Sequence, residues 1–317
     1  MMDVGREFSD INPIGQDDGP HPVCSIKYSD EYSALMGYFR ACLATEELSE
    51  RVLRLTMGVI ETNPANYTAW HYRRKCLVAL NKDLAEELYF TTSIGGENPK
   101  NYQIWYHRRA ILEDLSGTLE DARMELDYVA GVLAEDSKNY HAWSHRQHLL
   151  TTYGLWDGEI DFVCCKIDED IRNNSAWNQR WFAVHGVARE RGEGAYQART
   201  EVEYALAKAE MDCFNESPFK YIEGILTECW TTPEAVSESS EEVAGLVELV
   251  KQSAAAMKDK GSPHVHSVLV EIFEREGKLD EARELCGELK DKVDVIRAKY
   301  WSYRMERISV AEQELEP

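Results

Sequence analysis

Apolar side chains recur three or four positions apart in two well-formed stretches: Leu48, Val52, Leu55 and Val59, and then Leu126, Val129, Ala130 and Leu133. This spacing places them on one face of an α-helix. Acidic residues beside the second stretch, at Glu120, Asp121 and Glu125, are expected on the opposite, solvent-facing side. No alternating run of apolar and polar residues is long enough to predict a sheet. The pattern therefore predicts a chain that is nearly all-α.

A second pattern is a repeated unit of Asn, Trp and Arg. The stretch "NYQIWYHRR" begins at Asn101, and "NYHAWSHRQ" begins at Asn139. The tryptophans of four such units follow one another at intervals of 35, 38 and 34 residues: Trp70, Trp105, Trp143 and Trp177. A fifth, decayed copy has Phe219 in the Trp position, and a sixth echo keeps Trp301 and Arg304. Repeats of this length are typical of stacked supersecondary units.

Each Asn is expected to begin a helix. The units at Asn66 and Asn101 follow Asn-Pro pairs, which favour turns. An Asn side chain at the N-cap accepts hydrogen bonds from backbone N–H groups that the first turn leaves unpaired, which stabilises the helix by about 1 kcal/mol relative to Ala. In the fifth copy Ser217, Pro218 and Phe219 follow the Asn, so we expect that helix to begin late and to pack loosely.

A pair of helices of about 14 residues cannot bury its apolar stripe alone, so successive pairs must stack. The predicted fold is all-α: a right-handed α-solenoid, or crescent, of stacked antiparallel helical hairpins (an α-α superhelix). The recurring Trp residues are expected to pack between hairpins, and the recurring Arg residues to bind neighbouring carboxylates or helix-end carbonyls. Residues 1–22, rich in Gly, Asp and Pro, are predicted to be a disordered leader. Residues 23–306 form the repeat domain, and residues 307–317 a tail.

Charge and motifs exclude several classes of function. The net charge is −22, so the chain should repel nucleic acid and anionic membranes. We expect no membrane insertion and a cytoplasmic location, because no signal sequence and no apolar run of about 18 residues is present. The eight cysteines are irregularly spaced, which predicts reduced thiols and no metal site. Familiar nucleotide-binding and hydrolase motifs are absent.

Basic residues stand just before three of the caps, at Lys100, Lys138 and Arg172. A cation beside the positive end of a helix dipole suits a bound anion such as a diphosphate. Each of these residues is equally consistent with an ordinary solvated surface position. Periodicity alone does not choose between Lys100 and Lys138.

The repeated units resemble the α subunit shared by protein farnesyltransferase and type I geranylgeranyltransferase. The stretches that carry the resemblance are "YFRACLATEELSERVLRLTMGVIETNPANYTAWHYRR", "NPKNYQIWYHRRAILE", "DSKNYHAWSHRQ", "DEDIRNNSAWNQRWF", "NESPFKYIEGIL" and "VDVIRAKYWSYR". They occur in the family's order and cover roughly residues 28 to 304.

This resemblance implies a crescent that wraps around a separate β subunit in an obligate heterodimer. In the family the β subunit holds the catalytic zinc and most of the isoprenoid pocket, and magnesium dependence stays open. The reaction transfers a farnesyl or geranylgeranyl group from its diphosphate to the cysteine of a protein that ends in a CaaX sequence. The expected partners are therefore a β subunit, an isoprenoid diphosphate and CaaX-ending proteins.

The resemblance also implies roles for particular residues. Lys138 and Tyr140 are expected to be catalytic, with Lys138 neutralising the departing diphosphate, and His141 is expected to bind substrate. Asn173, Arg146 and Trp177 are expected to support the site by holding the third and fourth units in register.

Two other interpretations remain. A tetratricopeptide-like, noncatalytic adaptor would bind peptides on a concave surface, and "GKLDEAREL" at Gly277 to Leu285 would suit it. However, units of variable length do not match a strict 34-residue repeat. A noncatalytic homologue that only scaffolds complexes is the second alternative, and the presence of Lys138, Tyr140 and His141 argues against it.

Overall fold

The computed structural model describes residues 4–192 and 195–315. The chain divides into two compact units, Met1–Tyr153 and Gly154–Pro317. Within the described residues all regular structure is helical, apart from one isolated bridge between Tyr196 and Val236. The all-α prediction is confirmed.

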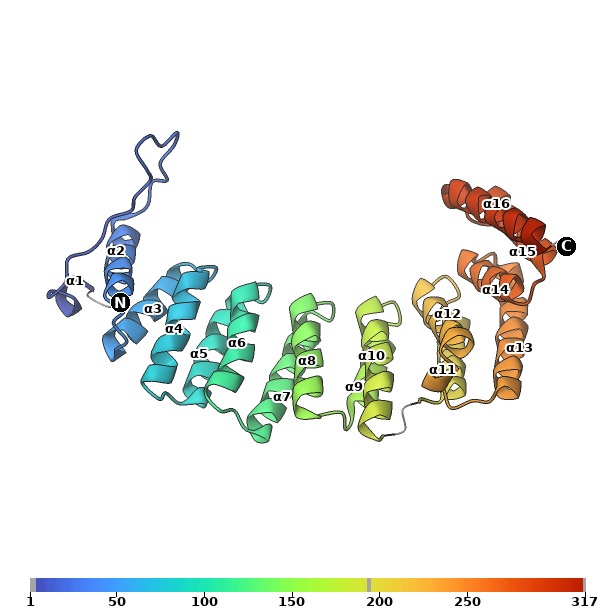
Figure 1. Cartoon of the computed structure of the whole chain (residues 1–317), viewed down its shortest axis with the longest axis horizontal. Coiled ribbons are helices and arrows are strands. Elements are labelled where there is room, and N and C mark those ends of the chain that lie inside the picture. Colours follow the sequence, from blue (N-terminus) through green and yellow to red (C-terminus); the bar gives the residue numbers. More distant parts are fainter. Residues whose placement is uncertain (1–3, 193–194, 316–317) are drawn as a thin grey trace. The chain divides into compact units, whose positions relative to one another are not determined.

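The first unit is a series of helical hairpins. Its helices are α1 (Val4–Glu7), α2 (Asp30–Ala44), α3 (Glu50–Thr62), α4 (Tyr67–Ala79), α5 (Leu84–Glu97), α6 (Tyr102–Asp114), α7 (Leu119–Glu135) and α8 (Tyr140–Tyr153). Helix α3 packs on α4, α5 on α6, and α7 on α8, while α4, α6 and α8 contact one another in succession (Figure 1). Each hairpin thus buries its apolar stripe against the next one.

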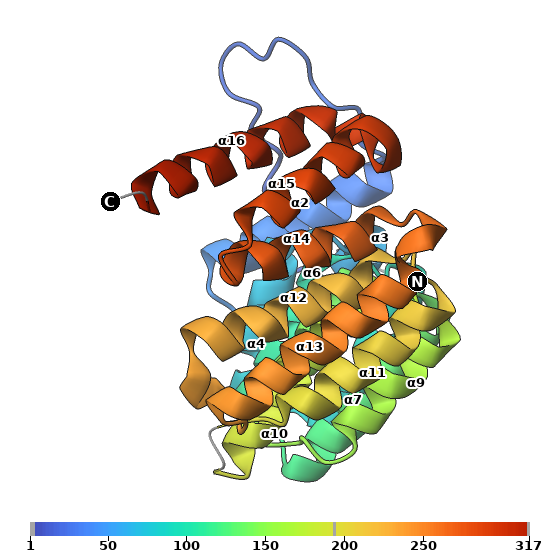
Figure 2. The same ribbon diagram turned by 90° about the vertical axis from the view of Figure 1, so that its right-hand side faces the viewer.

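The second unit continues the same type of packing. Its helices are α9 (Glu159–Glu169), α10 (Asn174–Glu190), α11 (Ala198–Met211), α12 (Glu216–Thr231), α13 (Ser240–Met257), α14 (Pro263–Arg275), α15 (Leu279–Glu288) and α16 (Ala298–Leu315). Short turns η1 (Pro233–Ala235), η2 (Lys258–Lys260), η3 (Leu289–Val293) and η4 (Val295–Arg297) join some of them. Figure 2 shows α12, α14 and α15 stacked one after another. Both units are therefore stacked antiparallel hairpins, as the repeat predicts.

The Asn residues cap their helices as expected. The side-chain oxygens of Asn66 and Asn101 accept from the backbone N–H groups of Ala69 and Gln103. The fifth unit differs from its prediction, because α12 begins directly after Asn215 and Phe219 is only 2% exposed. Pro218 falls in the first turn of α12, where an N–H group has no partner within the helix, so it does not delay the helix.

The repeated tryptophans lie in the core, with exposed fractions between 0% and 6%. Each indole N–H also donates to a carbonyl six residues earlier, in the loop before its own helix, at 2.8 to 3.0 Å. These bonds are Trp70 to Pro64, Trp105 to Pro99, Trp143 to Ser137 and Trp177 to Ile171. Each tryptophan therefore fixes the shape of the loop that leads into its own helix.

Residues on both sides of the predicted repeat domain, 23–306, also make contacts or continue a helix. Phe8 is fully buried, and Asp10 forms an ion pair with Arg51 at 2.6 Å, so part of the predicted leader packs on the first hairpins. An apolar ring and a carboxylate with partners on α3 outweigh the flexible composition around them. At the other end α16 continues through residue 307 to Leu315, with Ile308 buried. Residues 1–3 and 316–317 lie outside the described residues.

Candidate functional site

The loop before α8 carries the first predicted site residue, Lys138. The Lys138 side chain is exposed, and its backbone N–H donates to Asp136 Oδ1 at 3.3 Å. The other oxygen of Asp136 lies 3.3 Å from Nζ of Lys100, on the loop of the preceding hairpin. The Asp136 carboxylate thus contacts the backbone of Lys138 and the ammonium group of Lys100.

Tyr140 and His141 follow immediately on the first turn of α8. Tyr140 is 70% exposed, and its ring centroid lies 5.6 Å from that of His141. His141 is half-buried and meets the Tyr102 ring edge-on, with the centroids 4.3 Å apart. Burial lowers the pKa of His141, although a hydrogen bond with the Lys100 backbone opposes the shift. The imidazole is therefore neutral near pH 7, so Lys138 is the cation of this group.

Exposed tyrosines recur at the start of the second helix in three successive hairpins of the first unit. Tyr67, Tyr102 and Tyr140 are 70%, 68% and 70% exposed, and each follows a capping Asn. Large exposed aromatic rings are frequent at interaction surfaces, since a ring contributes much contact area at low entropic cost. Tyr67 and Tyr102 are recognisable in the sequence as the residue that directly follows the capping Asn.

The three supporting residues are buried. Arg146, in the first unit, is 6% exposed. Asn173 and Trp177 belong to the second unit, where Asn173 is 0% exposed and caps α10, and Trp177 donates to Ile171. These side chains cannot contact a ligand at the surface, which is consistent with a structural role. Lys138, Tyr140 and His141 lie close together at the beginning of α8, with Lys138 and Tyr140 exposed and His141 half-buried.

Buried ionic triads join neighbouring hairpins in the first unit. Arg73 binds both carboxylate oxygens of Glu87, at 2.8 and 2.6 Å, and His107 binds the same carboxylate at 2.7 Å. Arg108, Glu125 and His145 repeat the arrangement one hairpin later, with distances of 2.6, 2.5 and 2.8 Å. Arg73 and Arg108 therefore bind carboxylates, as the repeat predicts.

Glu125 was expected on the solvent-facing side of its helix, and this prediction is wrong, because the residue is only 2% exposed. Burial raises the pKa of Glu125, but the hydrogen bond from His145 and the charge of Arg108 outweigh burial and lower it to about 2. A buried arginine must have a carboxylate partner, so the repeated Arg itself was the signal for a buried Glu on an adjacent helix.

The second unit retains the triad with other donors in the histidine position. Arg180 binds Glu201 at 2.7 and 3.0 Å, and the hydroxyl of Tyr221 donates to the same carboxylate at 2.7 Å. Gln179 donates to Glu159 at 2.8 Å. His, Gln and Tyr share the ability to donate one hydrogen bond to the carboxylate, and this ability is what the third members have in common.

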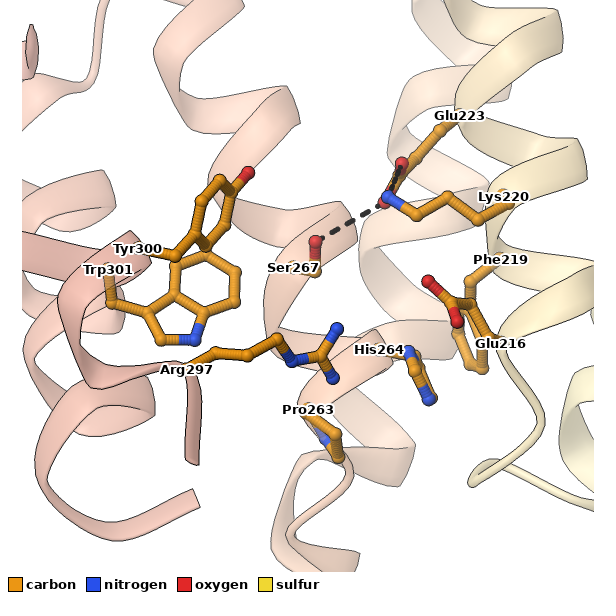
Figure 3. A pocket seen from close by; sticks show the side chains of 10 residues that line it. All are labelled: Glu216, Phe219, Lys220, Glu223, Pro263, His264, Ser267, Arg297, Tyr300 and Trp301. Carbon is orange, nitrogen blue, oxygen red and sulfur yellow. Dashed lines mark hydrogen bonds and ion pairs between the residues drawn. The ribbon is translucent and has the colours of Figure 1, made fainter. Parts of the chain in front are cut away.

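A separate cavity of about 190 Å³ lies in the second unit, between α12, α14 and the beginning of α16 (Figure 3). Its cations are already paired: Lys220 with Glu223 at 2.6 Å, and Arg297 with Asp294 at 2.8 Å. None of the predicted site residues lines it. Because acidic residues of the chain itself pair with these positive charges, the cavity is a poor candidate for an anion site.

The described residues include no cluster of three or more His, Cys, Asp or Glu side chains that could hold a metal ion. None of the helices in residues 4–192 and 195–315 is long and apolar enough to cross a membrane.

The stacked hairpins, their Asn caps and their Arg–carboxylate joints define a helical-repeat protein. Four segments match the protein prenyltransferase alpha subunit repeat, at residues 49–80, 84–115, 122–153 and 156–186. The chain is 37% identical to the "Protein farnesyltransferase/geranylgeranyltransferase type-1 subunit alpha" of Dictyostelium discoideum, over 96% of this chain and 92% of that protein. It is also 37% identical to the Arabidopsis thaliana protein of the same name, over 96% of this chain and 95% of that protein.

Among solved structures, the chain is similar to Candida albicans protein geranylgeranyltransferase-I complexed with GGPP. The TM-score is 0.81 and the sequence identity 29%, over 95% of this chain and 98% of that chain. The chain belongs to the protein prenyltransferase alpha subunit family.

Proposed function

We propose that this chain is the α subunit of a heterodimeric CaaX protein prenyltransferase. The enzyme would transfer a farnesyl or geranylgeranyl group from its diphosphate to a C-terminal CaaX cysteine. Family membership over almost the whole chain supports this function over a peptide-binding adaptor. The observation that carries the site is the exposed group of Lys138, Tyr140 and His141 beside the loop of the preceding hairpin.

The β subunit would supply the zinc site and most of the isoprenoid pocket. Zinc on that subunit would hold the acceptor cysteine as a thiolate, because metal coordination deprotonates a thiol. The exposed tyrosines of α4, α6 and α8 offer aromatic contact area for this partner.

Lys138 would act on the leaving group. When the bond between the prenyl carbon and the diphosphate breaks, negative charge develops on the diphosphate oxygens, and a fixed ammonium group stabilises that charge. The phenol of Tyr140, one helical residue beyond the cap, would donate a hydrogen bond to the same oxygens. His141, which is neutral, would contact substrate without adding a second charge.

The free thiols support a cytoplasmic location. All eight cysteines are unpaired, including those exposed at Cys24 and Cys165. Free thiols are typical of a reducing compartment, so we place the enzyme in the cytoplasm.

The two equivalent lysines give a matched test. Lys138→Ala and Lys100→Ala would each be coexpressed with the β subunit, and single-turnover transfer to a CaaX peptide would be measured. We expect Lys138→Ala to slow transfer by at least tenfold with unchanged isoprenoid affinity, because its charge acts mainly in the transition state. Lys100→Ala should stay within about threefold of the parent. Equal rates for the two variants, or a Lys138→Ala rate within twofold of the parent, would remove Lys138 from the mechanism.

A further inference from the structure

Asn139 separates the two residues assigned to catalysis, Lys138 and Tyr140, and it is only 1% exposed. Its side-chain oxygen accepts from the backbone N–H groups of His141 and Ala142, at 3.0 and 3.1 Å, and so caps α8. Its amide nitrogen makes a different contact, donating at 3.1 Å to the carbonyl of Pro99, forty residues earlier in the chain. One side chain thus fixes the beginning of α8 and ties it to the preceding hairpin.

The carbonyl of Pro99 is a shared acceptor. It also accepts a hydrogen bond from the indole N–H of Trp105 at 2.9 Å. Trp105 and Asn139, which belong to two successive hairpins, thus donate to the same oxygen. The arrangement recurs in the second unit, where the carbonyl of Ile171 accepts from Trp177 at 2.9 Å and from Asn215 at 2.7 Å. The contact is therefore not isolated. We call this arrangement, in which one loop carbonyl accepts from a Trp of its own hairpin and from the capping Asn of the next, a joint between hairpins.

The joint around Asn139 has a consequence that the joint around Asn215 lacks. The Pro99 carbonyl belongs to the loop that also carries Lys100 and leads to Tyr102, and His141 contacts both of those residues. The hydrogen bond from Asn139 to this loop therefore fixes the position of Lys138 and Tyr140 relative to the neighbouring hairpin. Displacement of a catalytic group by about 1 Å can reduce a rate by about a hundredfold.

We infer that Asn139 is a positioning residue for Lys138, acting through the hydrogen bond that its side-chain amide nitrogen donates to the Pro99 carbonyl. The inference rests on the proposed function. Capping and positioning use different atoms of the same side chain: the oxygen caps α8, and the nitrogen reaches the preceding hairpin. Substitutions that keep a capping oxygen and remove the nitrogen therefore separate the two roles.

The variants are Asn139→Asp and Asn139→Ser, both of which can still cap a helix. Asp retains the shape and adds a charge, while Ser removes the nitrogen without adding charge. The matched control is Asn215→Asp, which removes the equivalent bond to Ile171 in the second unit. Each variant would be purified as the heterodimer with the β subunit, and its melting temperature, single-turnover rate and KM for a CaaX peptide would be measured.

Both Asn139 variants are expected to lose at least tenfold in single-turnover rate with KM within about twofold of the parent. Asn215→Asp should lower the melting temperature about as much as Asn139→Asp does. Its single-turnover rate should stay within about twofold of the parent rate. A rate loss in Asn215→Asp equal to that of Asn139→Asp would show that the joint acts only through stability and would overturn the inference. Retention of the parent rate by Asn139→Ser would also overturn it.

A double-mutant cycle separates this inference from the proposed function. If Asn139 acts through Lys138, Asn139→Ser should slow transfer in the parent and have no further effect, within about twofold, in Lys138→Ala. Independent losses that multiply would reject the positioning role and leave the catalytic role of Lys138 standing. A Lys138→Ala enzyme at the parent rate would reject the catalytic role itself, and the positioning role with it.

Discussion

The two buried glutamates of the first unit depend on partners from neighbouring helices. Glu87 and Glu125 lie in the core, each between an arginine and a histidine from two different helices. A buried carboxylate is tolerated only when it is paired and hydrogen-bonded, and removal of one partner of a buried ion pair costs about 3 to 5 kcal/mol. The charge, its partners and the contact between hairpins are therefore inseparable at this scale.

Protonation of the Glu125 carboxylate at low pH should lower the free energy of unfolding. The folded pKa of Glu125 is lowered to about 2 from 4.5, so the folded state favours the charged form. The stabilisation is fully present above pH 4.5 and is lost as the pH falls from 4.5 towards 2. A shift of this size corresponds to a contribution on the order of 3 kcal/mol.

The measurement is the free energy of unfolding in urea at several pH values. Glu125→Gln should be less stable than the parent at pH 7 and should lose part of the decline between pH 4.5 and 2. Glu120→Gln, on the same helix at a site whose side chain is 71% exposed, serves as the control and should follow the parent. An identical acid profile for parent and Glu125→Gln would refute this assignment.

The donor role of the third triad member predicts which replacements of His145 are tolerated. Gln179 is a natural alternative for this role, so His145→Gln should change the unfolding free energy by less than about 1 kcal/mol. His145→Leu removes one hydrogen bond to the Glu125 carboxylate and should lower the unfolding free energy by about 1 to 3 kcal/mol. Denaturant titration at pH 7 compares the two, and equal stability of His145→Leu and the parent would show that the bond to Glu125 contributes nothing.

At the scale of the helices, close packing is decided by single small residues. Gly186 on α10 lies against the ring of Trp156, and a β-carbon at this position would overlap the indole. Gly131 on α7 is also helical, but a β-carbon there would meet nothing within 4 Å. The same residue type therefore has a packing role in one helix and none in the other.

This contrast predicts opposite effects of one substitution. Gly186→Ala should destabilise the protein by about 1 to 3 kcal/mol, since overpacking forces the indole or the helix to move. Gly131→Ala should stabilise it by about 0.5 to 1 kcal/mol, because alanine has the higher helix propensity. Thermal melting of both variants checks the sign, and a stabilising Gly186→Ala would contradict the packing.

For the whole molecule, the repeat architecture predicts that damage stays local. A hairpin in such an array contacts mainly its neighbours, so stability is close to a sum of units and of interfaces between neighbours. Arg180→Met would leave Glu201 buried without its ion-pair partner. Hydrogen exchange should then accelerate in α10, α11 and α12, which hold the triad, while α3 and α4 keep their protection. Uniform loss of protection along the chain would instead indicate one cooperative unit.

The sequence by itself determined the elements, because their causes are local. An Asn beside a turn caps the helix that follows it, and apolar residues at helical spacing define the face that must be buried. The same local reasoning placed Lys138, Tyr140 and His141 at the beginning of a helix, and the tertiary structure leaves this group exposed. The preference for Lys138 over Lys100 came from family resemblance and remains a prediction.

Only the tertiary structure decided which distant groups meet. Glu125 has the appearance of a solvent-facing residue in the sequence, but its partners Arg108 and His145 come from helices on either side of it in the chain. The acceptor for Asn139 is a carbonyl forty residues away, and Phe8 is buried although its surroundings are polar and flexible in composition. Such pairings depend on how whole hairpins stack, because burial selects a partner by proximity in space, and local propensity carries no information about it.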